Sequence, residues 1–382
     1  MNNHKKTKVL YIITLLSWGG AQKYVYDLAH GLGNGADWEP IISGGDQAKG
    51  ELAEKAKSCG LKLITIKNLV REVSPLKDLM AVWEIKKLIE IQKPDVVHLN
   101  SSKAGVVGSI AARISKHRAK IIFTCHGWVF NENLNPLVKF IYLAMEILTG
   151  RFNDKIICLS GLDKKTALAK KITTADKLLV IYNGIEEKNN FLEKEPARKA
   201  LGLPPAGIVV GTIGNFFANK GLEYFIEAIE ILLSEYKLGA TALIIGDGEQ
   251  RQKLEKLITE KHLEKNIILA GTKKDASQYL KAFDIYLSSS VKEGVPYSII
   301  EAMRAGLPVV ATRVGGIPEI INDGQDGLLT ETKNPAALAE KIKILLDDKA
   351  LAENLARQAT KKIQTAFNKE KMVAATLAVY KS

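Results

Sequence analysis

The sequence predicts an α/β protein built from two doubly wound domains, each a parallel sheet with helices on both faces. Short apolar runs alternate with amphipathic segments along the chain, which is the pattern of parallel strands joined by helices. The alternation stops in a polar stretch, residues 186–207, that contains Pro196, Pro204 and Pro205, and then restarts. The chain has 382 residues, more than one ordinary hydrophobic core accommodates.

The strands are predicted from apolar runs, because strands covered on both faces are apolar throughout. In the first half these runs span residues 9–16, 40–43, 61–66, 95–100, 121–125, 156–160 and 178–181. In the second half they span residues 208–213, 240–245, 267–270, 285–289 and 308–312. Amphipathic helices are expected between them, for example over 21–32 and 76–92. Residues 334–382 are expected to be helical, without another strand.

This pattern divides the chain into four segments. Residues 1–185 are predicted to form an N-terminal domain and residues 208–365 a C-terminal domain, with a linker over 186–207. Residues 366–382 are predicted to form a helix that packs back on the N-terminal domain. Ligands of doubly wound sheets bind beyond the carboxyl ends of the strands, so two facing domains predict a cleft.

The N-terminal segment permits two interpretations. Lys5, Lys6 and Lys8 precede the apolar run 9–16 and a Gly-Gly-Ala sequence, in the order of a secretory signal peptide. The run is short, and it is equally typical of a buried parallel strand that leads into a glycine turn and a helix. We expect the strand.

The charge of the chain is concentrated in its first half. Residues 1–185 contain 27 Lys and Arg against 16 Asp and Glu, whereas residues 186–382 contain 27 against 26. A basic half favours phosphate-bearing partners: anionic lipid, nucleic acid or a phosphorylated substrate. Charge that merely keeps the protein soluble is the alternative.

The cysteines indicate a reducing compartment. Cys59, Cys125 and Cys158 are widely spaced and lie in or beside apolar segments, with no CxxC and no Cys/His metal spacing. We therefore expect a reducing, cytoplasmic compartment and buried thiols. No Asp-x-Asp diphosphate-metal motif, His cluster or GxSxG sequence is present, so we expect no metal and no cofactor.

Two carboxylates eight positions apart, Glu293 and Glu301, form the most informative local feature. Glu293 follows the predicted strand 285–289, and Glu301 lies more than a turn inside the next helix. Pro296 is expected at the first helical position, where its missing N–H costs nothing. Carboxylates around the positive end of a helix can hold a ligand that carries hydroxyl groups and phosphate. A solvated loop glutamate beside an unrelated helical one is the alternative.

Two glycine-containing loops each follow a strand and open a helix. Gly19 and Gly20 follow the first strand, and the segment from Gly214 to Lys220 and Gly221 occupies the same place in the second half. Glycine lets backbone approach a phosphate closely, and a lysine there adds positive charge. Neither loop has the GxGxxG order of dinucleotide-binding proteins or the GxxxxGK[ST] order of the P-loop. The alternative is that both loops are ordinary turns and that Lys220 is a solvent-exposed surface lysine.

A histidine stands where parallel sheets bind ligands. His126 follows the strand 121–125, at its carboxyl end. A structural histidine is the alternative. Gly246-Asp247-Gly248 and the turn at Asn183 also end strands, and each alone is an ordinary turn signal.

These segments stand in a fixed order along nearly the whole chain. They are the Gly19-Gly20 loop, Thr124-Cys125-His126-Gly127, and the segments 180–186, 211–221, 245–248, 293–301 and 305–319. In this order they resemble the retaining glycosyltransferases of family 4, which have the GT-B fold of two Rossmann-like domains. Each motif alone is weak evidence for this family, whereas the ordered set of motifs is specific to it.

The resemblance implies how a nucleotide diphosphate sugar is held. Glu301 would bind the ribose hydroxyls. Glu293 would hold the donor sugar together with the backbone of Gly294, Val295, Pro296 and Tyr297. Both glutamates thus become binding groups rather than an acid/base couple, and Glu293, together with His126, is the residue expected at the catalytic centre.

It also implies roles for the loops. Lys220 and the backbone of Gly20 would stabilise the departing diphosphate without a metal. His126 would lie beside the reacting sugar, and Gly271 and Thr272 would border the base. Retention of configuration is implied by the family, and we favour same-face attack over a covalent intermediate on Glu293.

The sequence departs from the family at two positions. Asn215 stands where many relatives have Arg, so diphosphate binding would rest on Lys220 and backbone amides. Gln22 stands where many have Glu, next to Gly19 in the loop assigned to the acceptor. Both departures bear on the choice of donor or acceptor.

The acceptor is expected on the basic N-terminal domain, as is usual in this fold, and the donor on the C-terminal one. The apolar helical stretch 136–151 is too short to span a bilayer but suited to lie on one; a helix packed in the domain is the alternative. We therefore expect a UDP-sugar donor, a polyprenyl-diphosphate-linked glycan acceptor, and peripheral contact with the anionic inner membrane face, in surface polysaccharide assembly.

Two rivals remain. A nucleotide-sugar epimerase or a sugar-phosphate synthase would share the two-domain fold. A basic nucleic-acid-binding protein is the rival from another class. It has little support, because aromatics make up only 7% of the chain and no nucleic-acid motif is present. We expect no nucleic-acid partner.

Overall fold

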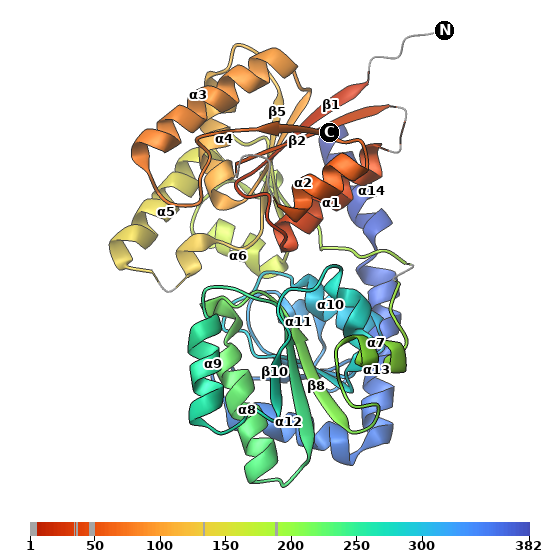
Figure 1. Cartoon of the computed structure of the whole chain (residues 1–382). Coiled ribbons are helices and arrows are strands. Elements are labelled where there is room, and N and C mark those ends of the chain that lie inside the picture. Colours follow the sequence, from red (N-terminus) through yellow and green to blue (C-terminus); the bar gives the residue numbers. More distant parts are fainter. Residues whose placement is uncertain (1–5, 34, 36, 46–49, 133, 188–189) are drawn as a thin grey trace. The chain divides into compact units, whose positions relative to one another are not determined.

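The computed structural model describes residues 6–33, 35, 37–45, 50–132, 134–187 and 190–382. Lys5 of the segment that resembles a signal peptide lies outside these residues. The chain divides into two compact units (Figure 1). Unit 1 comprises Met1–Asn183 and Glu370–Ser382, and unit 2 comprises Gly184–Lys369.

Unit 1 contains a seven-stranded parallel sheet in the order β3-β2-β1-β4-β5-β6-β7. Its strands are β1 (Thr7–Ile13), β2 (Trp38–Gly44), β3 (Lys62–Thr65), β4 (Val96–Asn100), β5 (Lys120–Cys125), β6 (Lys155–Cys158) and β7 (Leu178–Val180). Its helices are α1 (Gly20–Gly33), α2 (Glu51–Ser58), α3 (Pro75–Gln92), α4 (Ser102–Ile114), α5 (Pro136–Gly150), α6 (Gly161–Ala169) and α14 (Lys369–Lys381). Short 3₁₀ turns cover Val129–Asn131 and Ala175–Lys177. The run 9–16 therefore covers the interior strand β1, which pairs with β2 and β4, and the loop after it.

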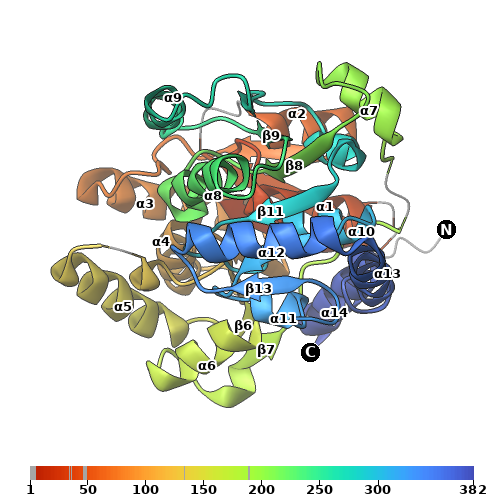
Figure 2. The same cartoon turned by 90° about the horizontal axis from the view of Figure 1, so that it is seen from below.

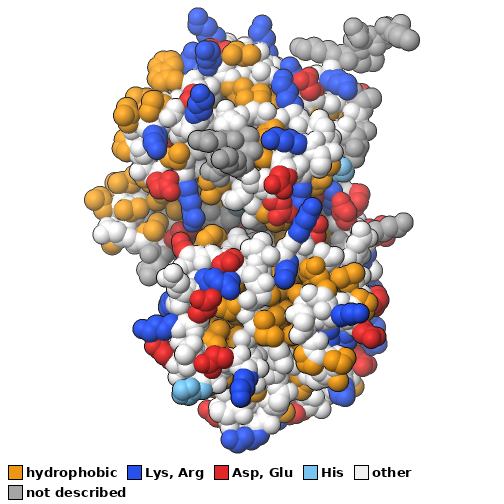
Figure 3. Space-filling view, viewed as in Figure 1, with side chains coloured by type: hydrophobic (Ala, Val, Ile, Leu, Met, Phe, Trp, Pro, Cys, Tyr) orange, Lys and Arg blue, Asp and Glu red, His pale blue; other side chains and the backbone are white. Residues whose placement is uncertain are grey.

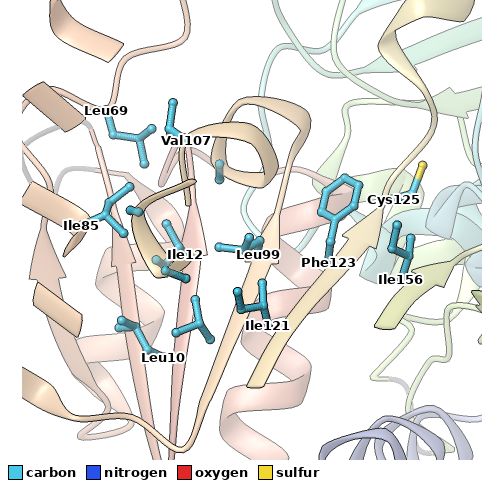
Figure 4. Close-up of a cluster of buried hydrophobic side chains, with 14 of the residues drawn as sticks. Leu10, Ile12, Leu69, Ile85, Leu99, Val107, Ile121, Phe123, Cys125 and Ile156 are labelled. Carbon is cyan, nitrogen blue, oxygen red and sulfur yellow. The ribbon is translucent and has the colours of Figure 1, made fainter. Parts of the chain in front are cut away.

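Each face of this sheet has its own apolar layer, because successive side chains of a strand point to opposite faces. Leu10 and Ile12 of β1 pack with α3 and α4 in one buried cluster, which Phe123 and Cys125 of β5 join (Figure 4). Tyr11 points to the other face, where its hydroxyl meets a side chain of α14. The C-terminal helix is thus part of unit 1.

Unit 2 contains a six-stranded parallel sheet in the order β10-β9-β8-β11-β12-β13. Its strands are β8 (Ile208–Ile213), β9 (Ala240–Ile245), β10 (Ile267–Leu269), β11 (Ile285–Ser288), β12 (Val309–Thr312) and β13 (Leu328–Thr330). Its helices are α7 (Lys194–Ala200), α8 (Leu222–Ser234), α9 (Arg251–Glu260), α10 (Tyr297–Arg304), α11 (Ile317–Ile320), α12 (Pro335–Asp347) and α13 (Lys349–Ala366). Two 3₁₀ segments cover Ala218–Lys220 and Ala276–Ala282. Helices α8 and α12 pack together over the sheet (Figure 2).

The predicted fold class, two doubly wound parallel sheets, is confirmed. The prediction of buried thiols holds for Cys125 and Cys158 but is wrong for Cys59, which is exposed. Three further local predictions need correction. The strand β13 was missed, because its three residues are too few for a recognisable pattern. The segment 186–207, predicted as a linker, includes the helix α7 and belongs to unit 2. Pro296 precedes α10 instead of starting it, since its ψ of 123° is extended.

Arg198 ties the proline-containing part of this segment, residues 194–207, to the rest of unit 2. Its side chain is 1% exposed, and its guanidinium donates to the carbonyls of Ala282, Pro205 and Gly207. The fourth partner is the carboxylate of Asp284, at 2.8 Å. A buried guanidinium needs such a full set of acceptors. The segment is therefore fastened to the sheet of unit 2, although its composition is that of a linker.

No helix in the part of the chain that the structure describes is long and apolar enough to cross a membrane.

Candidate functional site

The predicted donor-site residues of unit 2 lie in the loops that follow parallel strands. Lys220 comes after β8, Gly271 and Thr272 after β10, and Glu293 after β11. Because the strands are parallel, these loops share the carboxyl edge of the sheet, where such folds bind ligands.

Lys220 and Glu293 form an ion pair at this edge. The Nζ atom of Lys220 lies 2.6 Å from Oε1 of Glu293, and the hydroxyl of Ser290 donates to the same oxygen at 2.7 Å. The Glu293 side chain is 9% exposed and that of Lys220 23%. Burial lowers the pKa of Lys220, but attraction and hydrogen bonding to Glu293 outweigh it, so the pKa is raised. The lysine is therefore held charged and in place.

The two loops that carry this pair are joined through Asn219. Its carbonyl accepts from the amide of Val291 at 2.8 Å, and its side chain donates to the carbonyl of Lys292 at 3.3 Å. Gly221 follows with a φ of 56°, and a Cβ there would lie 2.5 Å from the carbonyl oxygen of Ser289. The loops after β8 and β11 thus act as one preorganised unit.

A second glycine sets the backbone of Glu293. Gly315 has a φ of 56°, and a Cβ on it would lie 1.8 Å from the carbonyl oxygen of Glu293. The amide of Gly316 donates to the carbonyl of Gly294 at 2.9 Å. Only glycine permits this approach, so the loop after β12 fixes the carboxylate-bearing loop.

The helix α10 begins directly after this loop. Val295 and Tyr297 are buried, with exposures of 4% and 7%. Since those side chains are in the core, Gly294 to Tyr297 can offer a ligand mainly backbone and the positive end of α10. Glu301 is half-buried in the second turn of the helix.

The remaining predicted donor residues border the loops after β8, β9 and β10. The amide of Gly246 donates to the carbonyl of Gly271 at 3.0 Å, and a Cβ on Gly246 would lie 1.9 Å from the carbonyl oxygen of Gly214. Asn215 and Thr272 are exposed. The three strand ends therefore pack closely, with two polar side chains open to solvent.

Unit 1 contains the other predicted residues. Gly20 is the exposed first residue of α1, and Gly19 precedes it. The side-chain amide of Gln22 donates to the carbonyl of Leu15 at 3.0 Å, which ties the helix to the loop after β1. The acceptor residues proposed from the sequence thus lie where this loop meets the first turn of α1.

His126 lies at the carboxyl end of β5, as the sequence indicated. Its Nε2 atom lies 3.3 Å from Oδ1 of Asn100, and its ring meets the edge of Tyr24, with the centroids 5.1 Å apart. Burial lowers the pKa of His126 to about 3. At neutral pH this ring is uncharged, so it can orient a hydroxyl but cannot act as a charged acid.

A buried polar chain behind His126 connects the sheet with α14. The hydroxyl of Tyr380 donates to Tyr11 at 3.1 Å and lies 2.5 Å from Nδ1 of His98. The Nε2 atom of His98 lies 2.7 Å from the hydroxyl of Thr124. Since Tyr380 donates to Tyr11, it accepts from Nδ1–H, and Nε2 accepts from Thr124. Sequence reasoning missed this chain because its members are far apart along the sequence.

This chain predicts an acid-sensitive unit 1. Burial, and to a smaller extent the neighbouring His126, lowers the pKa of His98 to about 3. The unfolded state therefore binds more protons below pH 6.5, and stability present above that pH is lost as the pH falls. From pH 7 to pH 5, His98 alone removes about 2 kcal/mol from the free energy of unfolding.

The test is urea unfolding of the wild type and of His98→Gln at both pH values. All four tryptophans (Trp18, Trp38, Trp83 and Trp128) lie in unit 1, so their fluorescence reports this unit. The variant is expected to have a lower free energy of unfolding than the wild type at pH 7. Between pH 7 and pH 5, its free energy of unfolding is expected to fall by about 2 kcal/mol less than that of the wild type. Equal losses in both proteins would contradict the role of His98.

No group of three or more metal-ligating side chains occurs among the residues whose positions are described.

Both halves of the chain match family models. Residues 18–189 match the model described as Glycosyltransferase Family 4. Residues 193–362 match the model described as Glycosyl transferases group 1.

Curated relatives agree with these matches. The chain is 30% identical over 318 residues to the UDP-Gal:alpha-D-GlcNAc-diphosphoundecaprenol alpha-1,3-galactosyltransferase of Escherichia coli, which covers 81% of this chain and 80% of that protein. It is 26% identical over 313 residues to the capsular polysaccharide biosynthesis glycosyltransferase CapM of Staphylococcus aureus, with 78% and 80% covered.

Solved structures share the fold. HepE of Anabaena, in complex with UDP and glucose, matches with a TM-score of 0.85 at 22% identity, over 98% of this chain and 100% of that one. Sucrose-phosphate synthase of Thermosynechococcus elongatus matches with a TM-score of 0.83 at 21% identity, over 98% of each chain. The chain belongs to the family 4 glycosyltransferases and has their GT-B fold.

Proposed function

We propose that this enzyme transfers a sugar from a UDP-sugar to a polyprenyl-diphosphate-linked glycan, with retention of configuration, in surface polysaccharide synthesis. The observation that carries the donor half of the proposal is the Lys220–Glu293 pair, 2.6 Å apart at the carboxyl edge of unit 2. It combines a fixed cation and a fixed carboxylate beside the N-terminus of α10. A sugar diphosphate offers a matching anion and hydroxyl groups.

In this proposal the diphosphate lies against Lys220 and the positive end of α10. Breaking the sugar–phosphate bond builds negative charge on the departing diphosphate. Groups already oriented toward that charge stabilise the transition state without reorganising. The backbone of Gly20 assists, and Asn215 adds a neutral polar contact where a second cation is common in relatives.

Glu293 then serves as a hydrogen-bond acceptor for the donor sugar. Its Oε1 atom already accepts hydrogen bonds from Lys220 and Ser290, which occupy its lone pairs and lower its nucleophilicity. This favours attack from the same face, in which the leaving phosphate oxygen takes the acceptor's proton, over a covalent intermediate. Glu301 binds the ribose hydroxyls, and Gly271 and Thr272 border the base.

Unit 1 takes the acceptor. It carries 29 Lys and Arg against 17 Asp and Glu, whereas unit 2 carries 25 of each, so the whole net charge of +12 belongs to unit 1. Such a field attracts a diphosphate-linked acceptor and an anionic membrane surface. Gly19 and Gln22 contact the acceptor, and the neutral His126 orients the reacting sugar. We place the enzyme in the cytoplasm, peripheral to the inner membrane face.

The test is a panel of UDP-, GDP- and CMP-sugars, screened by calorimetry for binding and then incubated with membrane lipid extracts. We expect a UDP-sugar to bind and its sugar to appear in the lipid fraction. Epimer formation, or transfer only to a sugar phosphate, would replace the proposal with one of the rival activities. Binding of nucleic acid without sugar turnover would overturn it.

A further inference from the structure

The large hydrophobic side chains that are exposed in the described part of the chain share one unit, unit 1. All 14 large hydrophobic residues that are exposed among those the structure describes belong to this unit, and ten of them lie on α3 and α5. Phe140 is 68% exposed and Leu76 70%. A soluble domain scatters such residues singly, and a concentration on two helices marks an interaction surface.

Both helices already have a buried side, so these residues form a second apolar side. Ala81, Val82 and Ile85 of α3 belong to the core cluster, and Tyr142 and Leu143 of α5 pack against it. A surface helix normally carries polar residues opposite its core face. On α3 and α5 that place is taken instead by the docking face: Leu76, Leu79, Trp83, Leu137, Phe140 and Ile141.

The topology brings the two parts of the docking face to one end of unit 1. Helices α3 and α5 both pack on α4, over the same face of the sheet. Each leads from the carboxyl end of one parallel strand to the amino end of the next, so the N-terminal halves of both helices lie at the carboxyl edge. Hydrophobic side chains gather over these helices (Figure 3). His126 and the Gly19-Gly20 loop occupy the same edge.

The charges of these two helices favour an anionic partner. Asp78, in the N-terminal half of α3, is paired with Lys103 at 2.7 Å, and Glu84, in the middle of the helix, accepts from Asn68 at 2.6 Å. The charged residues of α5 are Lys139 and Glu146 alone, and Glu146 is 3% exposed. What α5 exposes is therefore apolar side chains with one lysine, within a unit of net positive charge.

We propose that the docking face inserts its apolar side chains into the outer layer of an anionic lipid bilayer. The inference rests on the proposed function, because a polyprenyl-linked acceptor lies in that bilayer. Leucine, phenylalanine and tryptophan on helices that lie along the surface partition into the headgroup–acyl boundary, while lysines remain at the phosphates. Docking then brings the carboxyl edge of unit 1 to the depth at which a lipid diphosphate is reached.

The experiment measures sedimentation with phosphatidylglycerol-containing and pure phosphatidylcholine vesicles, at low and high salt. We compare the wild type with Leu137→Ser/Phe140→Ser and Leu79→Ser/Trp83→Ser. The control is Ile91→Ser/Ile114→Ser, which removes exposed hydrophobic residues from the opposite ends of α3 and α4. Each docking variant is expected to bind phosphatidylglycerol vesicles about tenfold more weakly or worse, and the control to bind like the wild type.

The fluorescence of Trp83, 57% exposed without lipid, gives a second measurement. It is expected to be quenched by lipids brominated on the acyl chain, in a component that Trp83→Ser removes. Equal vesicle binding by the wild type and both docking variants would overturn the proposal. So would self-association, measured by analytical ultracentrifugation, that the docking substitutions abolish while vesicle binding stays unchanged.

Failure of this inference is distinguishable from failure of the proposed function. None of the substituted residues belongs to the donor site, so UDP affinity measured by calorimetry is expected to be unchanged in every variant. If vesicles bind through the docking face while the wild type binds no nucleotide sugar, the docking stands and the proposed function fails. If UDP binds and the docking variants still bind vesicles like the wild type, the proposed function stands and the docking inference fails.

Discussion

A Lys220→Met variant is expected to lose about 100- to 1,000-fold in kcat at saturating donor, the usual cost of removing one preorganised group that stabilises transition-state charge. Methionine keeps the unbranched stem of Lys220, whose Cε would lie 3.6 Å from a Cβ on Gly214. The substitution therefore removes the charge with little change in packing. Steady-state kinetics with the donor sugar identified in the panel supply the measurement.

A matched control separates this effect from the loss of any ion pair. Lys261 pairs with Glu230 at 2.6 Å in the same unit, and its side chain is 24% exposed, against 23% for Lys220. Lys261→Met is expected to leave kcat within about twofold, because a surface pair contributes little. If both variants lost activity equally, or neither did, Lys220 would have no special part in catalysis.

A Glu301→Ala variant is expected to bind UDP about 30- to 100-fold more weakly, because hydrogen bonds from two ribose hydroxyls to one carboxylate are lost. The decisive comparison is between UDP and 2′-deoxy-UDP by calorimetry. The wild type should prefer UDP, and the variant should bind both alike. Glu340→Ala, an exposed glutamate on α12, serves as the control with unchanged affinity.

An undiminished preference for UDP in Glu301→Ala would overturn the ribose assignment. Because Glu301 is half-buried, its substitution also removes contacts within the fold. The melting temperatures of both variants must therefore match that of the wild type, so that a lower affinity is not a loss of folded protein.

The strands and the edge that bears the candidate site could be predicted from the sequence, because both follow from local patterns. Apolar runs mark buried strands, and a residue that follows such a run stands at the carboxyl edge, as Lys220, Glu293 and His126 do. The order of strands within each sheet is a consequence of packing and had no local signal.

The contacts that tune the site could not be predicted in this way. Lys220 and Glu293 are 73 residues apart, and their pairing depends on β8 and β11 being neighbours in the sheet. The same holds for Gly315, whose approach to Glu293 comes from a third loop. The sequence did contain a weak signal for the hydrogen bond from Ser290 to Glu293. Ser290 belongs to a run of three serines, residues 288–290, at the end of β11.

The ionisation of His126 was also beyond sequence reasoning. Its position predicted a ligand-facing histidine, but burial beside Tyr24 lowers its pKa to about 3. The chain behind it joins His98 to Tyr380, which are 282 residues apart. A pattern read along the strand cannot reveal a partner on the last helix.

The central claim is that this enzyme moves a sugar from a nucleotide diphosphate to a lipid-linked acceptor. The most direct test incubates the full chain with a radiolabelled UDP-sugar and membrane lipid extract, and measures label in the organic phase. We predict label that depends on the wild-type protein, persists in Lys261→Met and falls about 100-fold or more in Lys220→Met. Label that stays wholly in the aqueous phase for every nucleotide sugar that binds the folded wild type would contradict the claim.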